Sequence, residues 1–269
     1  ALPHGAAADY AAELVSAGRR VIDLSADFRL DDAEAYRAWY GKAHPAPEQL
    51  ARVPYVVPEI ARARGIPWHD APLIACPGCY PTSVQVPLYP LLRDRLVDAS
   101  RLVIHSMSGV SGAGRRAEEF YSYCERAESA GAYGSPAHRH VPEIEQELSR
   151  FVGEAVTVQF TPHLLPMRIG IATTVVAPCS VSIEELYASW ERAYPAGETP
   201  FIRVLPSGRF PQTGSVTGSN RVEISAVKDP RTGNAVIFSA IDNLVKGAGG
   251  QAIQIFNLAA GLPETCGLA

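Results

Sequence analysis

The segment Ala75–Thr82 constrains the fold most strongly, because an apolar run ends there in a Pro-Gly turn that carries Cys79 and opens a helical pattern. The run Pro72–Ala75 predicts a buried strand, and Pro81 falls in the first turn of the following helix, where a proline removes no hydrogen bond. Unpaired N–H groups and the positive end of the helix dipole favour thiolate over thiol. The order of strand, turn and helix therefore predicts that Cys79 is an exposed nucleophile.

A second reactive cluster, His138-Arg139-His140, lies in a Gly/Ser/Pro-rich loop and could supply the base that a catalytic thiol needs. Together with Cys79 it indicates acyl chemistry through a thioester. Two other interpretations stay open. Cys76 and Cys79 form a Cys-x-x-Cys pair, as in redox dithiols and zinc sites, and a lone cysteine in a turn is commonly a buried apolar residue. The other cysteines provide no second pair; they are Cys124, Cys179 and Cys266.

The segment Pro77–Thr82 resembles the active-site signature of the N-acetyl-gamma-glutamyl-phosphate reductases, the arginine-pathway members of the semialdehyde dehydrogenase group. Further blocks along the chain resemble the same family in the same order: Ala1–Gly5, Asp23–Leu30, Ser108–Arg115, His138–Ile144, Thr161–Met167, Gly218–Asn220, and Asp242–Gly247 running on to Gly250–Ala252. The resemblance therefore covers the chain from its first residues to its last helix.

The fold class that follows is α/β plus α+β. It combines the remainder of a doubly wound, Rossmann-type nucleotide domain with a catalytic domain built on a mixed or antiparallel sheet, similar to glyceraldehyde-3-phosphate dehydrogenase. The expected division is 1–77 for the NADP-binding part, 78–244 for catalysis and oligomerisation, and 245–269 for a helix that returns to the nucleotide domain. The resemblance places a Gly-rich phosphate loop upstream of Ala1, roughly 60–80 residues of additional chain.

Periodicity and turn residues predict the elements along the chain. Helices are expected at Ala6–Ala17, Asp31–Tyr40, Pro142–Phe151, Ser182–Tyr194 and Gly247–Leu262, and after Cys79, where Pro87 and Pro90 would kink or divide the helix. Strands are expected at Arg20–Leu24, Pro72–Ala75, Arg101–Met107, Ala155–Phe160, Gly170–Cys179, Phe201–Val204, Val222–Val227 and Ala235–Asp242. The stretch His44–Pro72 is expected to be mostly loop.

Composition limits the partners. The chain has 269 residues, 47% of them hydrophobic, and a formal net charge of −4, which is typical of a globular protein with a substantial core. No apolar run is long enough to span a membrane, and no basic patch interleaved with aromatics indicates nucleic acid. We therefore expect a cytoplasmic protein without a nucleic-acid or membrane partner, and the resemblance adds a small-molecule acyl-phosphate substrate and a homo-oligomer, either a dimer or a tetramer.

The resemblance also implies roles for individual residues. Cys79 would attack an acyl phosphate and form a thioester, which hydride from NADPH would reduce to the aldehyde. His138 would be the acid/base partner, and His163 is its rival. The expected cofactor residues are Pro3, His4, Ser108, Gly109, Ser111, Gly112, Asn243 and Gly247, the expected substrate residues are Arg115 and His163, and no metal is expected. Each also has an ordinary structural interpretation as a turn, a packing residue or a solvated side chain.

The sequence departs from the family pattern at two places. The family continues Pro-Met with one residue and then Arg-Gly-Ile, whereas here Arg168 follows Met167 directly. In a strand that shift would turn the arginine to the other face. Ser83 stands where the family more often has Gly or Ala.

The leading hypothesis is NADPH-dependent reduction of N-acetylglutamyl phosphate to the semialdehyde, with release of orthophosphate. Two alternatives are a lysine-pathway relative that acts on carrier-bound aminoadipyl phosphate, and a non-catalytic assembly module. A cysteine hydrolase is a further possibility, although a reductase must keep water from its thioester.

Overall fold

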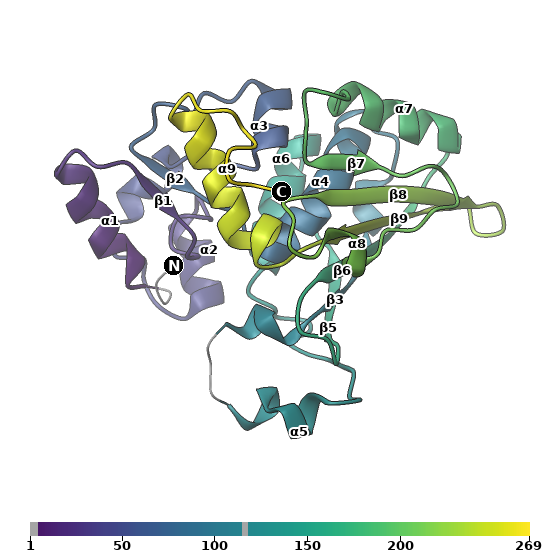
Figure 1. The fold of residues 1–269 in the computed structure, drawn as a ribbon, viewed down its shortest axis with the longest axis horizontal. Coiled ribbons are helices and arrows are strands. Elements are labelled where there is room, and N and C mark those ends of the chain that lie inside the picture. The colour runs from purple at the N-terminus through teal and green to yellow at the C-terminus, as the bar shows by residue number, and fades with distance from the viewer. Residues whose placement is uncertain (1–4, 115–117) are drawn as a thin grey trace.

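Two sheets organise the computed structural model, which describes residues 5–114 and 118–269. Figure 1 shows a small helical layer around the two-stranded sheet at one side and a long sheet at the other, with the final helix α9 lying between them. The final helix α9 packs against β1 and α3 of the first part of the chain.

The first part of the chain alternates helices with short parallel strands. It contains α1 (Ala7–Ser16), β1 (Val21–Asp23), α2 (Ala33–Tyr40), a 3₁₀ turn at Pro47–Arg52, α3 (Pro58–Arg64) and β2 (Leu73–Ala75). β1 and β2 pair in parallel with Val21 opposite Leu73, which confirms the predicted strands. The prediction of mostly loop over His44–Pro72 is wrong for α3. Pro58 there occupies the first helical turn, where proline starts a helix instead of ending one.

The central helix α4 (Cys79–Arg93) runs without interruption through Pro87 and Pro90. Each proline lacks the N–H that would bond to the carbonyl four residues earlier. Side chains replace both bonds: the Ser239 hydroxyl donates to Ser83 O at 2.6 Å, and the Tyr194 hydroxyl donates to Val86 O at 2.8 Å. The expected division of this helix is therefore absent, because its neighbours satisfy the freed carbonyls.

The large sheet has seven strands in the order β4-β5-β3-β6-β9-β8-β7. Its strands are β3 (Val103–Ser108), β4 (Gly131–Ala132), β5 (Gln159–Leu164), β6 (Ile171–Pro178), β7 (Ile202–Val204), β8 (Val222–Asp229) and β9 (Asn234–Ile241). The β3–β5 and β7–β8 pairs are parallel and the other pairs are antiparallel, so the sheet is mixed, as expected. One prediction is misplaced: the strand expected at Ala155–Phe160 begins only at Gln159.

Helices α4, α6 (Val141–Val152) and α7 (Ile183–Ala193) surround the main core, and α4 packs directly on β6, β8 and β9. The remaining short elements are 3₁₀ turns at Ala99–Arg101, Val110–Ala113 and Glu119–Tyr121, α5 (Tyr123–Arg126), α8 (Thr213–Val216), a π-helical turn at Val245–Gly249, and α9 (Gly250–Ala259). α4 thus lies between the large sheet and the first part of the chain, with Cys79 at its first position.

Candidate active site

Cys79 is the first residue of α4 and follows Gly78, whose extended backbone caps the helix without a side chain. The thiol is half-buried and opens on a cavity of about 300 Å³. The predicted arrangement of strand, turn and helix is present, since β2 ends at Ala75. The cavity is lined by Cys79, Tyr80, Ser108, Gly109, Gly112, Ala113, Tyr121, Tyr133, Gly134, Ala137, His138, Arg139, His140 and Leu164.

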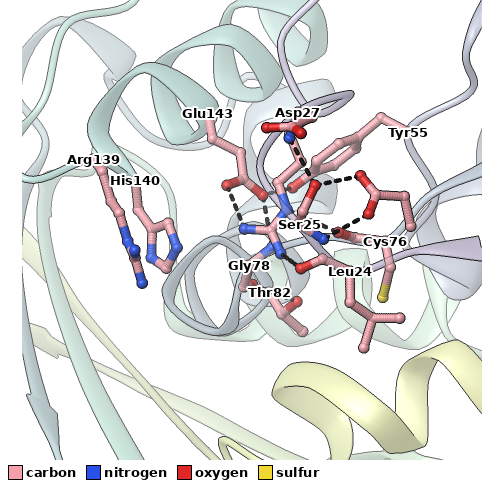
Figure 2. A network of polar contacts seen from close by, with 12 residues as sticks. Leu24, Ser25, Asp27, Tyr55, Cys76, Gly78, Thr82, Arg139, His140 and Glu143 are labelled. Atoms are coloured by element: carbon pink, nitrogen blue, oxygen red, sulfur yellow. Dashed lines mark hydrogen bonds and ion pairs between the residues drawn. The ribbon is translucent and has the colours of Figure 1, made fainter. Parts of the chain in front are cut away.

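A buried ion pair between Arg29 and Glu143 holds the turn before Cys79, and Figure 2 shows Glu143 beside Gly78 and Tyr55. Glu143, on the first turn of α6, accepts hydrogen bonds from Gly78 N at 2.7 Å and from the Tyr55 hydroxyl at 2.8 Å. Its other oxygen lies 3.4 Å from Arg29 Nη1. Arg29 donates through Nε to Cys76 O at 2.9 Å and through Nη2 to Leu24 O at 2.8 Å. These contacts fix both ends of the Cys76–Gly78 turn.

Gly78 has no room for a side chain in this network. A methyl group on its Cα would lie 2.7 Å from His140 Nε2, 2.8 Å from Arg29 Nη1 and 3.1 Å from Glu143 Oε2. The same distances show that the His140 ring reaches the backbone immediately before Cys79. His140 is therefore a second imidazole at the nucleophile.

His138 is nearly buried and its Nδ1 accepts a hydrogen bond from His140 N at 3.1 Å. The ring meets Tyr80 edge to face with centroids 5.4 Å apart. Burial, with the nearby Arg139 charge, lowers the pKa of His138 to about 4, so the imidazole is neutral at neutral pH. Because Nδ1 is an acceptor, the proton is assigned to Nε2, which can donate a hydrogen bond to a developing oxyanion.

The pKa of the Cys79 thiol is raised by burial, which outweighs the opposing effects of Arg29, of the Tyr80 N–H and of Arg139. The helix start does contribute a backbone donor to the sulfur, as the sequence predicted, but this donor does not make thiolate the resting form. A thiol of this kind needs a base to ionise.

The predicted cofactor residues divide into two groups. Ser108, Gly109 and Gly112 line the cavity. Ser111 and Asn243 bond to each other, with Asn243 Nδ2 donating to Ser111 Oγ at 3.0 Å, and Asn243 Oδ1 also accepts from Gly170 N at 2.7 Å. Both ends of the Asn243 amide are therefore hydrogen-bonded within the protein, and Asn243 fixes the loop of small residues that contains Ser111.

Gly247 lies directly against the nucleophile. A methyl group on Gly247 would be 2.8 Å from Cys79 Cβ and 3.2 Å from Cys79 Cα. The family blocks around Cys79 and around Gly247, far apart in the sequence, therefore meet at the thiol.

Three predicted residues, Pro3, His4 and Arg115, lie outside the described residues. His163 is on β5 but does not line the cavity: Leu164 does, and neighbouring side chains of a strand point to opposite faces. The ring of His163 lies 6.3 Å from that of His105 on β3. Arg168 lies in the loop between β5 and β6, so the strand argument for its orientation is wrong; the exposed residue accepts from Ser111 N through its carbonyl.

Several site residues were not predicted from the sequence: Arg29, Tyr55, Tyr80, Tyr133 and Glu143. The hydroxyls of Tyr80 and Tyr133 are 2.7 Å apart beside the cavity. Arg29, Tyr80 and Glu143 lie within the family blocks, and Glu143 is also a charged residue one position before Ile144 on the buried face of α6. Its partners come from segments that only the fold brings together.

The chain matches two family models, described as the semialdehyde dehydrogenase NAD binding domain over residues 1–65 and the semialdehyde dehydrogenase dimerisation domain over residues 79–243. It is 50% identical to the N-acetyl-gamma-glutamyl-phosphate reductase of Pelotomaculum thermopropionicum, over 100% of this chain and 77% of the relative. The reductases of Geobacter metallireducens and Azotobacter vinelandii are each 49% identical with the same coverage. The chain belongs to the N-acetyl-gamma-glutamyl-phosphate reductase family.

Solved structures of other semialdehyde dehydrogenases share the fold. Aspartate semialdehyde dehydrogenase II of Vibrio cholerae superposes with a TM-score of 0.70 at 21% identity, covering 97% of this chain and 78% of that one. The Candida albicans enzyme, solved with NADP, gives a TM-score of 0.64 at 15% identity, covering 97% of this chain and 77% of that one. The predicted α/β plus α+β architecture is confirmed.

Membership of this reductase family makes the chain an enzyme with a nicotinamide-binding domain, as predicted. The second family model assigns a dimerisation domain to the large sheet and its helices. Within residues 5–114 and 118–269, no helix is long and apolar enough to cross a membrane. The same ranges contain no group of three His, Cys, Asp or Glu side chains that could hold a metal ion.

Proposed function

We propose that the chain catalyses the NADPH-dependent reductive dephosphorylation of N-acetylglutamyl phosphate, with Cys79 as the nucleophile. The observation that carries the proposal is the position of Cys79 at the start of α4, facing a cavity that it shares with His138, His140 and Arg139. The relatives at 48–50% identity are named as reductases of this substrate, which favours it over the carrier-bound alternative and over an assembly module.

The thiol would attack the acyl carbon and expel orthophosphate, leaving a thioester on Cys79. Arg139 lines the cavity and is suited to the charged phosphate. His138, with Nε2 as a donor, would stabilise the oxyanion that develops at the carbonyl. We keep His138 as the acid/base partner. His140 is a second candidate for the acid/base role. If the His138 ring accepted a proton, its Nδ1–H would face the His140 N–H, and the two donors would repel each other.

A nicotinamide cofactor fits beside the thiol, and when bound it supplies the hydride that reduces the thioester. The 3₁₀ turn Val110–Ala113 and Gly109 present small side chains there. A methyl group on Gly112 would lie 3.0 Å from Ser108 Oγ, so the turn is built for close approach. Ser108, Gly109, Ser111, Gly112 and Gly247 would hold the cofactor, with Asn243 ordering the loop.

Several finer points belong to the proposal. They are NADP in preference to NAD, cofactor contacts from Pro3 and His4, a substrate contact from Arg115, the domain limits 1–77, 78–244 and 245–269, a cytoplasmic location, and a homodimer or homotetramer. A family model described as NAD binding, and a related structure solved with NADP, support the cofactor class.

The test is phosphate-dependent reduction of NADP, and in parallel of NAD, by N-acetylglutamate semialdehyde. Cys79→Ser should lower the rate at least about 1,000-fold, as expected for loss of a covalent nucleophile. Cys124→Ser, at an exposed cysteine, is the matched control and should behave as the parent. A parent protein that folds but shows no phosphate-dependent activity would refute the proposal.

A further inference from the structure

The π-helical turn Val245–Gly249 packs against Cys79 through Gly247. Gly247 N donates to Asp242 O at 2.9 Å and Gly249 N to Leu244 O at 3.0 Å, the five-residue spacing of a π turn. The packing of Gly247 on Cys79 leaves no room for a methyl group. The Cys76 thiol approaches Ala248 O at 3.9 Å. The π turn therefore contacts both ends of the segment Cys76–Cys79.

Lys246 lies inside this turn, and its side chain is completely buried. Its Nζ is 2.7 Å from Glu59 Oε1 on α3 and 2.8 Å from Gln254 Oε1 on α9. It also lies 5.8 Å from the ring centroid of Phe201, within reach of a cation–π contact. The ammonium therefore connects the π turn to three other segments.

Glu59 is equally buried, and its carboxylate is ionised in this setting. Burial opposes its charge, but Lys246 and the Gln254 amide together hold the pKa of Glu59 below its usual value. Gln254 Nε2 donates to Glu59 Oε1 at 2.9 Å, and Asn220 Nδ2 donates to Gln254 Oε1 at 2.9 Å. The Gln254 amide thus bridges the two members of the ion pair, and Asn220 in turn holds the Gln254 amide.

A buried ion pair is seldom more stabilising than apolar residues of similar volume, whereas removing one partner is strongly destabilising. Neither Lys246 nor Glu59 lines the cavity beside Cys79. What the pair does provide is a fixed position of the π turn relative to α3. That position determines how closely Gly247 packs on the Cα and Cβ atoms of Cys79.

We propose that Lys246 is a positioning residue for Cys79: its ion pair with Glu59 holds the π turn against the start of α4, so that Gly247 confines the thiol in its reactive orientation. The inference rests on the proposed function for the role of Cys79 as the nucleophile. It predicts that the reactivity of Cys79 depends on a residue that touches neither substrate nor cofactor.

The test measures alkylation of each cysteine by iodoacetamide near neutral pH, resolved by mass spectrometry, together with turnover. The variants are Lys246→Met and the double variant Lys246→Met/Glu59→Met, which leaves no unpaired buried charge and therefore folds even if the single variant does not. In both variants the ion pair no longer holds the π turn against α4. Cys79 should then alkylate at least about five times faster, and kcat should fall about 10- to 100-fold with KM little changed. Cys179, buried at the end of β6, should stay protected.

Lys228→Met is the matched control, because it removes a lysine whose Nζ donates to Val181 O far from the site. It should leave Cys79 alkylation unchanged. Three results would overturn the inference: Cys79 alkylation in the double variant within twofold of the parent, Cys79 and Cys179 becoming reactive together, or unchanged kcat despite faster alkylation. Alkylation requires no substrate, so an inactive parent would refute the proposed function and leave this test readable.

Discussion

At the scale of single residues, two glycines pack so closely around Cys79 that neither position has room for a side chain. Gly78 lies against His140, Arg29 and Glu143, and Gly247 lies against Cys79 itself. Neither glycine has a positive φ, so backbone conformation does not require glycine at either position. Both are needed because other atoms occupy the place that a side chain would take.

Replacing Gly247 should therefore displace the nucleophile. In Gly247→Ala the new methyl group would meet Cys79 Cβ at 2.8 Å and Cα at 3.2 Å, and backbone cannot yield as a flexible side chain does. We expect kcat to fall at least about tenfold, since misplacement of a reacting group by a fraction of an ångström is costly. Gly249→Ala, in the same π turn, is the control: its methyl group would lie 3.5 Å from Leu244 O, an ordinary contact. Equal activity in the two variants would contradict the prediction.

The neutral state of His138 predicts a pH dependence of stability. Its pKa is about 4 in the folded chain and about 6.5 when unfolded, so between these values the unfolded state binds more protons. Stability from this residue is therefore complete above pH 6.5 and is lost as pH falls toward 4. His138→Asn keeps an acceptor near Nδ1 and removes the titration.

The measurement is the free energy of unfolding of parent and variant by denaturant at several pH values. Between pH 6.5 and 4 the parent should lose on the order of 3 kcal/mol relative to His138→Asn, from a shift of about 2.5 units. His69→Asn, at an exposed histidine, provides the matched control. Parallel curves for parent and His138→Asn would show that burial does not suppress protonation of this ring.

At the scale of elements, α4 shows how a helix with two internal prolines remains whole. Ser239 and Tyr194 each donate to one carbonyl that a proline leaves without a partner. Ser239→Ala and Tyr194→Phe should each lower the free energy of unfolding by about 1–3 kcal/mol, because each leaves a buried carbonyl unsatisfied. Tyr10→Phe, at an exposed tyrosine, should change it little. Denaturant unfolding checks all three, and a loss no larger than that of Tyr10→Phe would mean that water satisfies the carbonyls.

These elements also show what the sequence could reveal. Helices with a clear apolar stripe or cap, such as α7 with its Ser182–Glu185 capping box, were predicted within a residue or two. α3 was missed because two prolines frame a short helix, and the continuity of α4 depends on hydroxyls from β9 and from beyond α7. The local sequence pattern of a helix does not reveal which distant side chains will donate hydrogen bonds to it.

The same limit applies to the site. The Cys79 motif and the His138-Arg139-His140 cluster were found because each is a run of neighbouring residues, and the fold does place both at one cavity. Arg29, Tyr55 and Glu143 were not found, because they become a network only when the loop after β1, the segment before α3 and the start of α6 converge on Gly78. His163 was ranked by its surroundings in sequence, which do not reveal the face of β5 on which it lies.

At the scale of the whole molecule, the large sheet presents one face to α4, and its opposite face is half-buried. Alternate residues of β6 divide between the faces: Thr173 bonds to Ser83 on α4, and Thr174 points the opposite way. On that face Thr174 lies between His105 of β3 and Phe238 of β9, with Val176 beside Val103 and Val236. A largely apolar face of this kind, in a segment that matches a dimerisation domain, is where subunits are expected to meet.

A charge at the centre of this face should therefore separate the subunits. Thr174→Arg would place an unpaired guanidinium in the contact, and we expect the dissociation constant to rise at least about 100-fold, since a buried charge without a partner costs several kcal/mol. Sedimentation across a range of micromolar concentrations would show the mass falling toward that of one chain, 28.8 kDa. Glu191→Arg on α7, which packs behind the sheet, is the control and should keep the parent mass. An unchanged mass in Thr174→Arg would mean that the subunits associate through another surface. If the mass and the reductase activity of Thr174→Arg fall together, the large sheet also supports the helix that carries Cys79. The link would be the contact between the Thr173 hydroxyl on β6 and the Ser83 hydroxyl on α4, at 2.8 Å.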